Sequence, residues 1–461
     1  MEWKSIPGEE LPRPAPHLPE VPYTHDYSQT MTMKMYLADP LPDGGSRVYI
    51  SVDEALEKIR AVDRITLGTK KIVYLVGWQY DGHDSKYPAW GECNPALRRP
   101  CDASARDSLR WLFEEAKKYN TTVSVHINMM DAYENSPLWN EYREKNLFCR
   151  NADGGILAGG FWGGRQAYLV CYKREWDSGM AVRRINGLCE LLPIREAGTV
   201  HIDAFMNPCL RGGCCDDNPG DRMGEASIET RRKIYRYFRS LGIDVTSEYM
   251  CVEPECESGR DYMIGLQPMA WHLCQLPEDY LRRPAQLICG GNTKNRQRGE
   301  VGVTMGRLFG ENVQGEGLFP RENYKELFLS EFCCRYLPFT FLNGLDRLRI
   351  ERYGNGAFRA YFSEGISSDT DQFTIRRGDS VLKQGNTLML PARWLPEDNR
   401  ILYSDEAGEH VWQIGAELGD RIRIRRLTAD GPEDESFVAD TVNGSLSLVH
   451  DATFAYLCTR A

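Results

Sequence analysis

Helical and strand-like patterns of apolar residues alternate along much of the chain. Apolar residues recur at helical spacing over 52–62, 109–116 and 225–241, and we expect another helix over 180–192. Short apolar runs that predict buried strands stand at 71–78, 122–128, 167–172, 198–205 and 244–250. Strand and helix alternating at this pitch predict βαβ units and a parallel sheet, either closed or doubly wound.

Further candidate elements extend this series. Strands are expected near 263–266, 286–289 and 304–309, and a helix over 321–336. The total of about six to eight strands fits a (β/α)₈ TIM-type barrel, which is the architecture we predict for residues 51–344.

The two ends of the chain do not show this alternation of strand and helix patterns. Residues 7–22 carry six prolines and read as an extended arm. The alternating stretches 31–37 and 47–52 are expected to pair as a small β unit, which completes an N-terminal region over 1–50. Beyond 345, short alternating segments separated by turns rich in Gly, Asp, Asn and Pro predict a C-terminal antiparallel β-sandwich over 345–461.

Composition excludes several classes of protein. The formal net charge of −10 argues against a nucleic acid partner, because phosphate binding depends on Lys and Arg. No apolar run is long enough to span a membrane, and the N-terminus shows no secretory signal, so we expect a cytoplasmic protein with no membrane partner. The composition does not predict an oligomeric state.

The 15 cysteines are expected to be reduced thiols, because their number is odd and two adjacent pairs occur. A zinc cluster is disfavoured, because no CxxC pair is matched by a second one. The cysteines that such a cluster would draw on are Cys209, Cys214, Cys215, Cys251 and Cys256.

Two predicted strands end in an acid. GTVHIDAF presents Asp203, and DVTSEYM presents Glu248, 45 positions later. One βα unit fits in that interval, so the two strands are predicted neighbours whose carboxyl groups come within about 5–5.5 Å, as in a retaining glycosidase. Asp203 would then attack the anomeric carbon, and Glu248 would protonate the leaving oxygen and later activate water. The alternative is that both acids are ordinary strand-end carboxylates in salt bridges.

Other polar and aromatic residues follow the predicted strand ends and are expected to bind the substrate. Trp78 and Tyr80 can stack on sugar rings, while His83 and Asp84 can bind hydroxyl groups. His126 and Asn128 close the next strand, and Asp131 follows them; His126 taken alone is more typical of a core histidine. Together these positions favour a sugar-binding bowl at the C-terminal ends of the strands.

The segments GWQYDGHDSKYP (77–88), VHIN (125–128), VHIDAF (200–205) and SEY (247–249) resemble the pattern of glycoside hydrolase families 101 and 129. These families remove α-linked N-acetylgalactosamine structures from mucin-type O-glycans. The spacing of the acids looks closer to the exo-acting family 129 than to the endo-acting family 101. The resemblance covers about residues 70–340.

By position, the resemblance makes Asp203 the nucleophile and Glu248 the acid/base, and it places His83 and Asp84 at the closed end of the sugar site. Trp162 in GGFWGGRQ matches an aromatic residue that lines the pocket. The chemistry requires no cofactor. Family 129 is associated with Ca²⁺, for which the acidic run 214–221 could supply oxygen ligands, although a solvated turn is the favoured interpretation there and no ligand set is predicted.

Three alternatives stay open. The first is a retaining α-glycosidase for another sugar, such as an α-galactoside or α-glucoside, or an endo-acting enzyme like those of family 101. The second is a glycan-binding protein without catalysis, which the presence of both acids disfavours. The third is a zinc hydrolase, which the absence of an HExxH motif disfavours. The sequence therefore predicts a retaining, exo-acting α-N-acetylgalactosaminidase.

Overall fold

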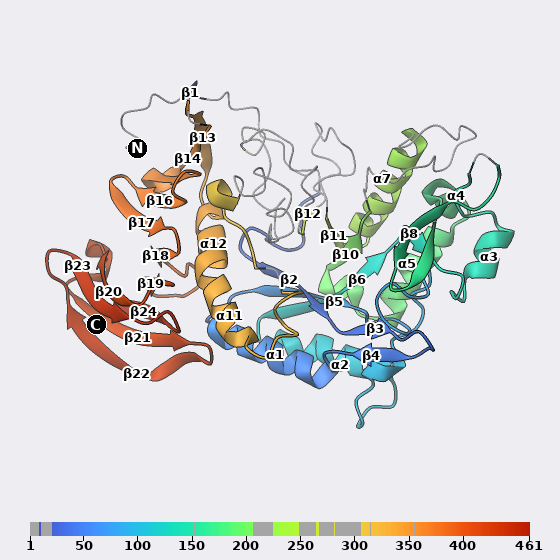
Figure 1. Cartoon of the computed structure of the whole chain (residues 1–461), viewed down its shortest axis with the longest axis horizontal. Helices are drawn as coiled ribbons and strands as arrows, with labels where there is room; N and C mark the ends of the chain where they lie inside the picture. The colour runs from blue at the N-terminus through green and yellow to red at the C-terminus, as the bar shows by residue number, and fades with distance from the viewer. Residues whose placement is uncertain are drawn as a thin grey trace.

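The structure is a computed structural model that describes residues 9–10, 21–151, 153–205, 225–248, 264–266, 281, 306–313, 315–354 and 356–461. Two sheets dominate the described residues, one parallel and one antiparallel, and helices α11 and α12 lie between them (Figure 1). Among the described residues, no helix is long and apolar enough to cross a membrane.

The parallel sheet has six strands in the order β12-β11-β10-β6-β5-β2. Every pairing between its neighbouring strands is parallel. The strands are β2 (Met31–Tyr36), β5 (Lys71–Val76), β6 (Thr121–Asn128), β10 (Thr199–Asp203), β11 (Asp244–Ser247) and β12 (Ile264–Gly265). The predicted alternation of strands and helices is confirmed over this half of the chain.

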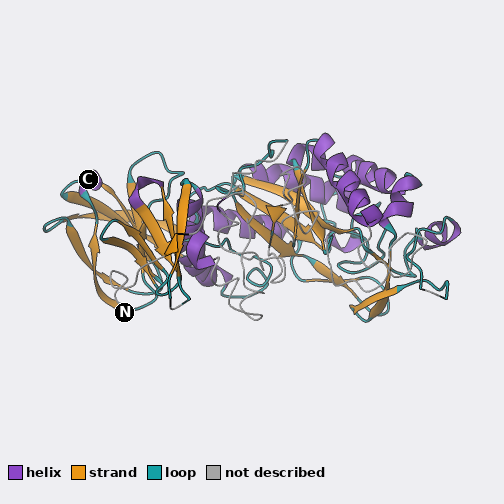
Figure 2. Cartoon of the chain, turned by 90° about the horizontal axis from the view of Figure 1, so that it is seen from above, coloured by secondary structure: helices purple, strands orange, loops and turns teal. Residues whose placement is uncertain are grey.

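Helices gather along one side of the parallel sheet (Figure 2). Most of their buried apolar residues share one hydrophobic core with the alternate strand residues Met33, Leu75, Val125 and Ile202, whereas α3 packs in a smaller cluster. The helices of this region are α1 (Val52–Ile65), α2 (Ala105–Lys117), α3 (Trp139–Glu144), α4 (Tyr172–Asp177), α5 (Met180–Leu191), α6 (Ile194–Ala197) and α7 (Glu225–Ser240).

Helix α1 shows how local sequence fixes these elements. Ser51 caps it by accepting from the Glu54 backbone NH at 3.3 Å, and the Glu54 carboxylate accepts from the Ser51 backbone NH at 2.7 Å. This capping box satisfies amide groups that the first helical turn leaves unpaired. Residues at helical spacing, including Leu56, Ile59 and Val62, are buried against the sheet.

The N-terminal pairing predicted from the sequence is wrong. The stretch 31–37 does not pair with 47–52; β2 joins the parallel sheet instead, with Met31 opposite Lys71 and Tyr36 opposite Val76. The short hairpin that does form joins β3 (Ala38–Pro40) to β4 (Ser46–Val48). The alternating pattern was real, but it could not show that the partner of β2 stands 40 positions further along the chain.

Two other strand predictions are also corrected. Residues 167–172 lie partly in β9 (Arg165–Leu169), which belongs to a separate three-stranded antiparallel sheet with β7 (Asp131–Ala132) and β8 (Ala158–Trp162). Residues 306–309 are helical rather than extended. The predicted strand at 263–266 is confirmed as β12, and the one at 286–289 lies outside the described residues.

The C-terminal strands and β1 form an eleven-stranded antiparallel sheet in the order β1-β13-β14-β15-β16-β17-β18-β19-β24-β21-β22. The helical segment before it comprises α11 (Tyr324–Glu331), a π-helical turn (Phe332–Tyr336) and α12 (Leu337–Asn343). The strands are β1 (Glu9–Glu10), β13 (Arg347–Arg352), β14 (Phe358–Phe362), β15 (Ile366–Asp369), β16 (Thr374–Arg377), β17 (Ser380–Gln384), β18 (Thr387–Leu390), β19 (Asn399–Tyr403), β21 (Arg421–Thr428), β22 (Gly431–Asp440) and β24 (Ala455–Arg460). A separate two-stranded antiparallel sheet is formed by β20 (Gly408–Gln413) and β23 (Ser445–His450).

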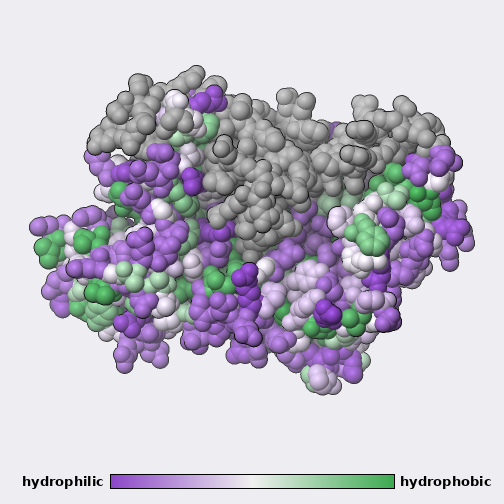
Figure 3. Space-filling model, viewed as in Figure 1, coloured by the Kyte–Doolittle hydropathy of each residue, from purple (hydrophilic) through white to green (hydrophobic). Residues whose placement is uncertain are grey.

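Where Figure 3 shows the described residues, their surface is mostly hydrophilic, with scattered apolar residues. The parallel sheet with its helices and the antiparallel sheet that follows confirm the prediction of an α/β region followed by an all-β region. The domain boundaries at 50 and 344 stay predictions.

A close backbone approach fixes the loop that leaves β5. Gly77 has φ +76°, and a Cβ there would lie 2.1 Å from the backbone oxygen of Ala38. We expect Gly77→Ala to lower the free energy of unfolding by roughly 3 kcal/mol or more, because it adds a backbone clash to the strain of a left-handed residue. Chemical denaturation measures this effect.

Gly242 provides the matched control. It has φ +75°, but a Cβ there would meet nothing within 4 Å. Gly242→Ala should therefore cost only the conformational strain, about 1–2 kcal/mol. Equal losses of stability in the two variants would contradict the close approach at Gly77.

Candidate active site

The two predicted catalytic acids occupy the ends of neighbouring parallel strands. In the register of β10 and β11, Ile202 lies opposite Ser247, an offset of 45 positions. Asp203 and Glu248 each follow by one residue, so the same offset places them in one row across the two strands. Asn128, at the end of β6, continues this row on the other side of Asp203. The prediction that the two strands are neighbours is confirmed.

Polar contacts surround the Asp203 carboxylate. The Asn128 amide Nδ2 donates to its Oδ2 at 3.4 Å, and the His126 Nε2 lies 3.6 Å from the same oxygen. Asn128 also donates to Asp131 Oδ2 at 2.9 Å and accepts from the Asp131 backbone NH. The next residue, Ala204, has φ +46°, in the left-handed region that non-glycine residues adopt uncommonly.

The loop after β5 brings His83 and Asp84 toward this row. The His83 Nε2 lies 3.4 Å from the Asp84 carboxylate, and its ring centroid is 5.1 Å from that of His126. The His83 backbone NH donates to the Ala38 carbonyl at 3.0 Å, so this bond and the close approach of Gly77 to Ala38 hold the loop against the start of β3. Tyr36, the last residue of β2, packs its ring 5.4 Å from His83.

Lys34 in β2 is a buried, charged residue that forms an ion pair with Glu248. Its side chain is only 2% exposed, and its Nζ lies 3.9 Å from Glu248 Oε1. Lys34 also interacts electrostatically with Asp203 and Glu316. A buried ammonium group among three carboxylates offsets charge that would otherwise be costly to bury.

The surroundings of the row shift the pKa values of its carboxyl groups in opposite directions. Burial works to raise the pKa of Asp203, but the contact with His126 and then the Lys34 charge outweigh it, so this pKa lies well below its usual range. Burial lowers the pKa of His126 to about 4, so this ring is neutral at pH 7 and acts as a polar partner rather than a cation. Asp203 is therefore ionised, the state that a nucleophile requires.

Asp131 behaves in the opposite way. Burial, and then the charges of Asp84 and Asp203, raise its pKa to about 8. Burial, and the charge of Asp203, also raise the pKa of Asp84. A carboxyl group that keeps its proton beside an ionised one can donate a hydrogen bond to a sugar hydroxyl.

The structure does not bring every predicted binding residue to this row. Trp78 is fully buried, and its indole NH donates to the His126 carbonyl at 2.9 Å, so it supports the strand from behind. Tyr80 is half-buried, with Lys86 over its ring. Trp162 lies beside Phe161 at the turn between β8 and β9, and their exposed fractions are 49% and 67%. Strand β9, which follows this turn, pairs with β7, where Asp131 lies opposite Leu169.

Sequence reasoning missed Lys34, Tyr36 and His201. The His201 ring meets the His126 ring edge to face, with centroids 5.1 Å apart, and its Nδ1 is 2.9 Å from the Thr246 hydroxyl. The signal was present for Lys34, because a lone lysine interrupts the apolar run MTMKMY. The lysine does not point to the site from the sequence alone, because the alternating pattern of 31–37 predicts a small β unit outside the barrel.

Among the described residues, no group of three or more His, Cys, Asp and Glu side chains could hold a metal ion. The acidic run 214–221 and the cysteines of the disfavoured zinc cluster lie outside the described residues. The eight cysteines that the structure describes form no disulfide with one another.

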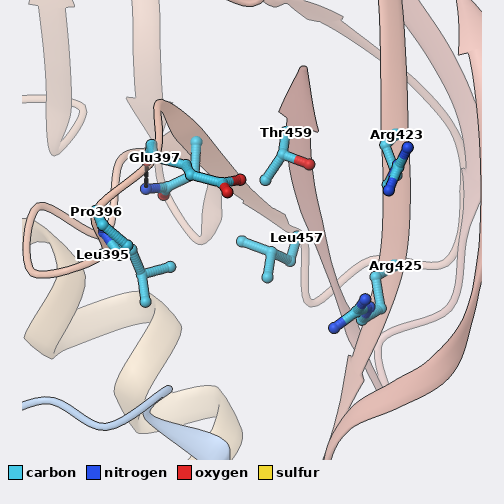
Figure 4. A pocket seen from close by; sticks show the side chains of 8 residues that line it. Leu395, Pro396, Glu397, Arg423, Arg425, Leu457 and Thr459 are labelled. Atoms are coloured by element: carbon cyan, nitrogen blue, oxygen red, sulfur yellow. Dashed lines mark hydrogen bonds between the residues drawn. The ribbon is translucent and has the colours of Figure 1, made fainter. Parts of the chain in front are cut away.

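A cavity of about 330 Å³ lies in the C-terminal sheet, away from the acids (Figure 4). Arg423 and Arg425 form one wall and the loop at Glu397 the other. None of the predicted site residues lines it.

A known protein family matches part of the chain. The family model described as endo-α-N-acetylgalactosaminidase, of glycoside hydrolase family 101, matches residues 45–252, a segment that contains both acids. A search of the curated proteins finds no match.

The α-N-acetylgalactosaminidase NagBb from Bifidobacterium bifidum has a similar fold. Its ligand-free structure matches with a TM-score of 0.53 and 13% identity, covering 76% of this chain and 57% of that one. Its GalNAc complex matches with a TM-score of 0.52 and 14% identity, covering 76% and 57%. The chain thus spans a little over half the length of these proteins.

Residues 45–252 thus match the model of a glycoside hydrolase family, and the described fold is similar to that of a glycosidase. The match to the family 101 model confirms the resemblance seen in the sequence. The closer likeness to family 129 stays a prediction.

Proposed function

We propose that this chain is a retaining, exo-acting α-N-acetylgalactosaminidase that acts on fragments of mucin-type O-glycans, with Asp203 as nucleophile and Glu248 as acid/base. The observation that carries the proposal is the shared row of the two acids on β10 and β11. Residues opposite each other on adjacent parallel strands point to the same face, and their backbones lie about 4.8 Å apart. This spacing suits the separation of about 5–5.5 Å between the carboxyl groups of retaining enzymes.

The reaction follows from the charges at the site. In the first step the Asp203 carboxylate bonds to the anomeric carbon, the glycosidic C–O bond breaks, and the proton of Glu248 passes to the leaving oxygen. In the second step Glu248 takes a proton from water, whose oxygen displaces Asp203 from the same carbon. The low pKa of Asp203 keeps it ionised for the attack, and the His126 and Asn128 contacts hold one of its oxygens.

We further propose that the parallel sheet closes into the (β/α)₈ barrel predicted from the sequence. The support lies along the outer edge of β2, where the Asn312 side chain donates to the Thr30 carbonyl at 3.0 Å. Gly315 also packs against the backbone oxygen of Lys34. A segment from the end of the α/β region therefore runs beside the first strand, as closure requires. A sandwich arrangement of the C-terminal strands stays a prediction.

An endo-acting enzyme is the second candidate, because the matching family model carries an endo description. The exposed pair Phe161 and Trp162 would suit it, since aromatic faces outside the closed end can bind further sugars. An endo enzyme would release a disaccharide, whereas the proposed exo enzyme releases a single sugar.

Aryl glycosides test the proposal. We expect turnover of p-nitrophenyl α-N-acetylgalactosaminide and little turnover of the α-galactoside, the α-glucoside or any β-glycoside. A disaccharide aryl glycoside, Gal-β1,3-GalNAc-α-p-nitrophenol, separates endo from exo action. Turnover of a different α-glycoside would change the proposed sugar but leave the proposed mechanism standing. Turnover of the disaccharide substrate alone would show endo action instead of exo action. Silence on every α-glycoside would contradict the proposal.

A further inference from the structure

Lys34 is placed for a role in the reaction rather than in the core. It stands in the middle of β2, where Met31, Met33 and Met35 face the hydrophobic core shared with the helices. Lys34 alternates with these methionines, so its side chain points to the opposite face of the sheet, toward the acids. There its Nζ meets Glu248 at 3.9 Å.

The groups that face Lys34 come from several elements of the fold. Asp203 and Glu248 stand at the ends of β10 and β11, and Glu316 lies on the segment beside β2. Tyr74 is the cross-strand neighbour of Lys34 on β5, and His126 on β6 also interacts with its charge. Burial works to lower the pKa of Lys34, but the three carboxylates outweigh it and raise this pKa, so the ammonium group is charged throughout the working pH range.

We propose that Lys34 is a positioning residue whose ammonium group holds Glu248 beside Asp203 and stabilises the negative charge that moves between them. This inference rests on the proposed function. In the first step Asp203 loses its charge as it becomes an ester, and Glu248 gains one as it gives up its proton. The charge thus arrives beside a fixed cation, and in the second step it returns to Asp203, which Lys34 also faces. Such preorganised charge costs no reorganisation during the reaction.

Lys71 shows what a purely structural lysine looks like in the same sheet. It lies on β5, its side chain is 1% exposed, and it forms an ion pair with Asp63 at 2.5 Å. Lys71 begins its strand, opposite Met31, and so lies at the end of the sheet far from the acids. Both lysines are buried and paired, but only Lys34 contacts a predicted catalytic group.

The test compares Lys34→Met with Lys71→Met in the full chain. For Lys34→Met we expect kcat/KM to fall by about 100-fold or more on the aryl α-glycoside that the wild type hydrolyses. We also expect both limbs of the pH profile of kcat/KM to move upward by at least about one pH unit, because removing a nearby positive charge raises the pKa of a carboxyl group. Lys71→Met should lose thermal stability but keep kcat/KM within about threefold and both limbs in place.

Lys34→Gln gives a second, smaller uncharged side chain with the same expected shifts. A folded Lys34 variant whose pH profile of kcat/KM has the same two limbs as that of the wild type would overturn the proposal. Failure of both Lys34 variants to fold, with Lys71→Met folded, would also overturn it and make Lys34 a folding residue.

NMR titration of ¹³C-labelled glutamate carboxyls gives a readout that needs no turnover, with Glu248→Gln identifying the Glu248 signal. We expect the Glu248 signal to titrate at higher pH in Lys34→Met than in the wild type. If the wild type hydrolysed none of the glycosides, the proposed function would be wrong. The titration would still show whether the Lys34 charge lowers the pKa of Glu248. An unmoved Glu248 signal would contradict the inference even in an active enzyme.

Discussion

Asp203→Asn is expected to abolish glycoside hydrolysis, with a fall in kcat of about 10⁴-fold or more, while the fold stays intact. An amide has almost the shape of a carboxylate but does not attack the anomeric carbon. Asn128 and His126 both contact a single oxygen of the Asp203 carboxylate, and the asparagine side chain still has one oxygen to make these contacts. Steady-state kinetics and a thermal melt of the purified variant measure the two effects.

Asp244→Asn is the matched control, because Asp244 is a buried acid at the opposite end of the adjacent strand β11. It accepts from the backbone NH groups of Thr24 and His25 and pairs with Arg239, so its loss should cost stability and not activity. Asp203→Gly adds a sharper readout, because azide can fill the space of the lost carboxylate. We expect azide to restore turnover and to form the β-glycosyl azide; an Asp203→Asn variant as active as the wild type would sink the assignment.

Glu248→Gln is expected to slow substrates with poor leaving groups by at least about 10³-fold and activated aryl glycosides far less. A poor leaving group needs the proton that Glu248 supplies, whereas a nitrophenolate leaves without it. Comparing kcat/KM for a nitrophenyl glycoside with that for a glycosylated serine derivative measures the difference. Equal losses on both substrates would contradict the acid/base role.

Azide separates the two acids by stereochemistry. In Glu248→Ala the covalent intermediate still forms on Asp203, and azide then displaces it, so the α-glycosyl azide should accumulate. Asp203→Gly should give the β-anomer under the same conditions. The same anomer from both variants would show that the roles of the two acids are not those proposed.

Much of the α/β region follows from local pattern. The apolar runs that became β5, β6, β10 and β11 were bounded by helices with clear apolar faces, and Asp203 and Glu248 could be placed because a strand end exposes its last side chain to the βα loops. The offset of 45 positions between the acids proved to be the register of the two strands. The spacing of the two acids in the sequence therefore predicted correctly that they stand opposite each other on neighbouring strands.

The missed features depend on contacts that spacing does not contain. β2 was assigned to a local hairpin because alternation does not reveal whether the partner strand is near or far in the sequence, and Lys34 was lost with it. Trp78 was expected at the sugar, but a tryptophan directly after a buried strand can equally turn into the core, as it does here. A buried lysine in an apolar strand is the more informative signal, since such a charge requires partners.

Trapping the covalent intermediate tests the central claim most directly. The enzyme would be incubated with the 5-fluoro α-glycosyl fluoride of the sugar that the aryl glycosides select, digested, and analysed by mass spectrometry. We predict that the label appears on the peptide that contains Asp203 and is absent from Asp203→Asn. An active enzyme labelled on another carboxylate, or never labelled and releasing the β-anomer first, would contradict a retaining mechanism with Asp203 as its nucleophile.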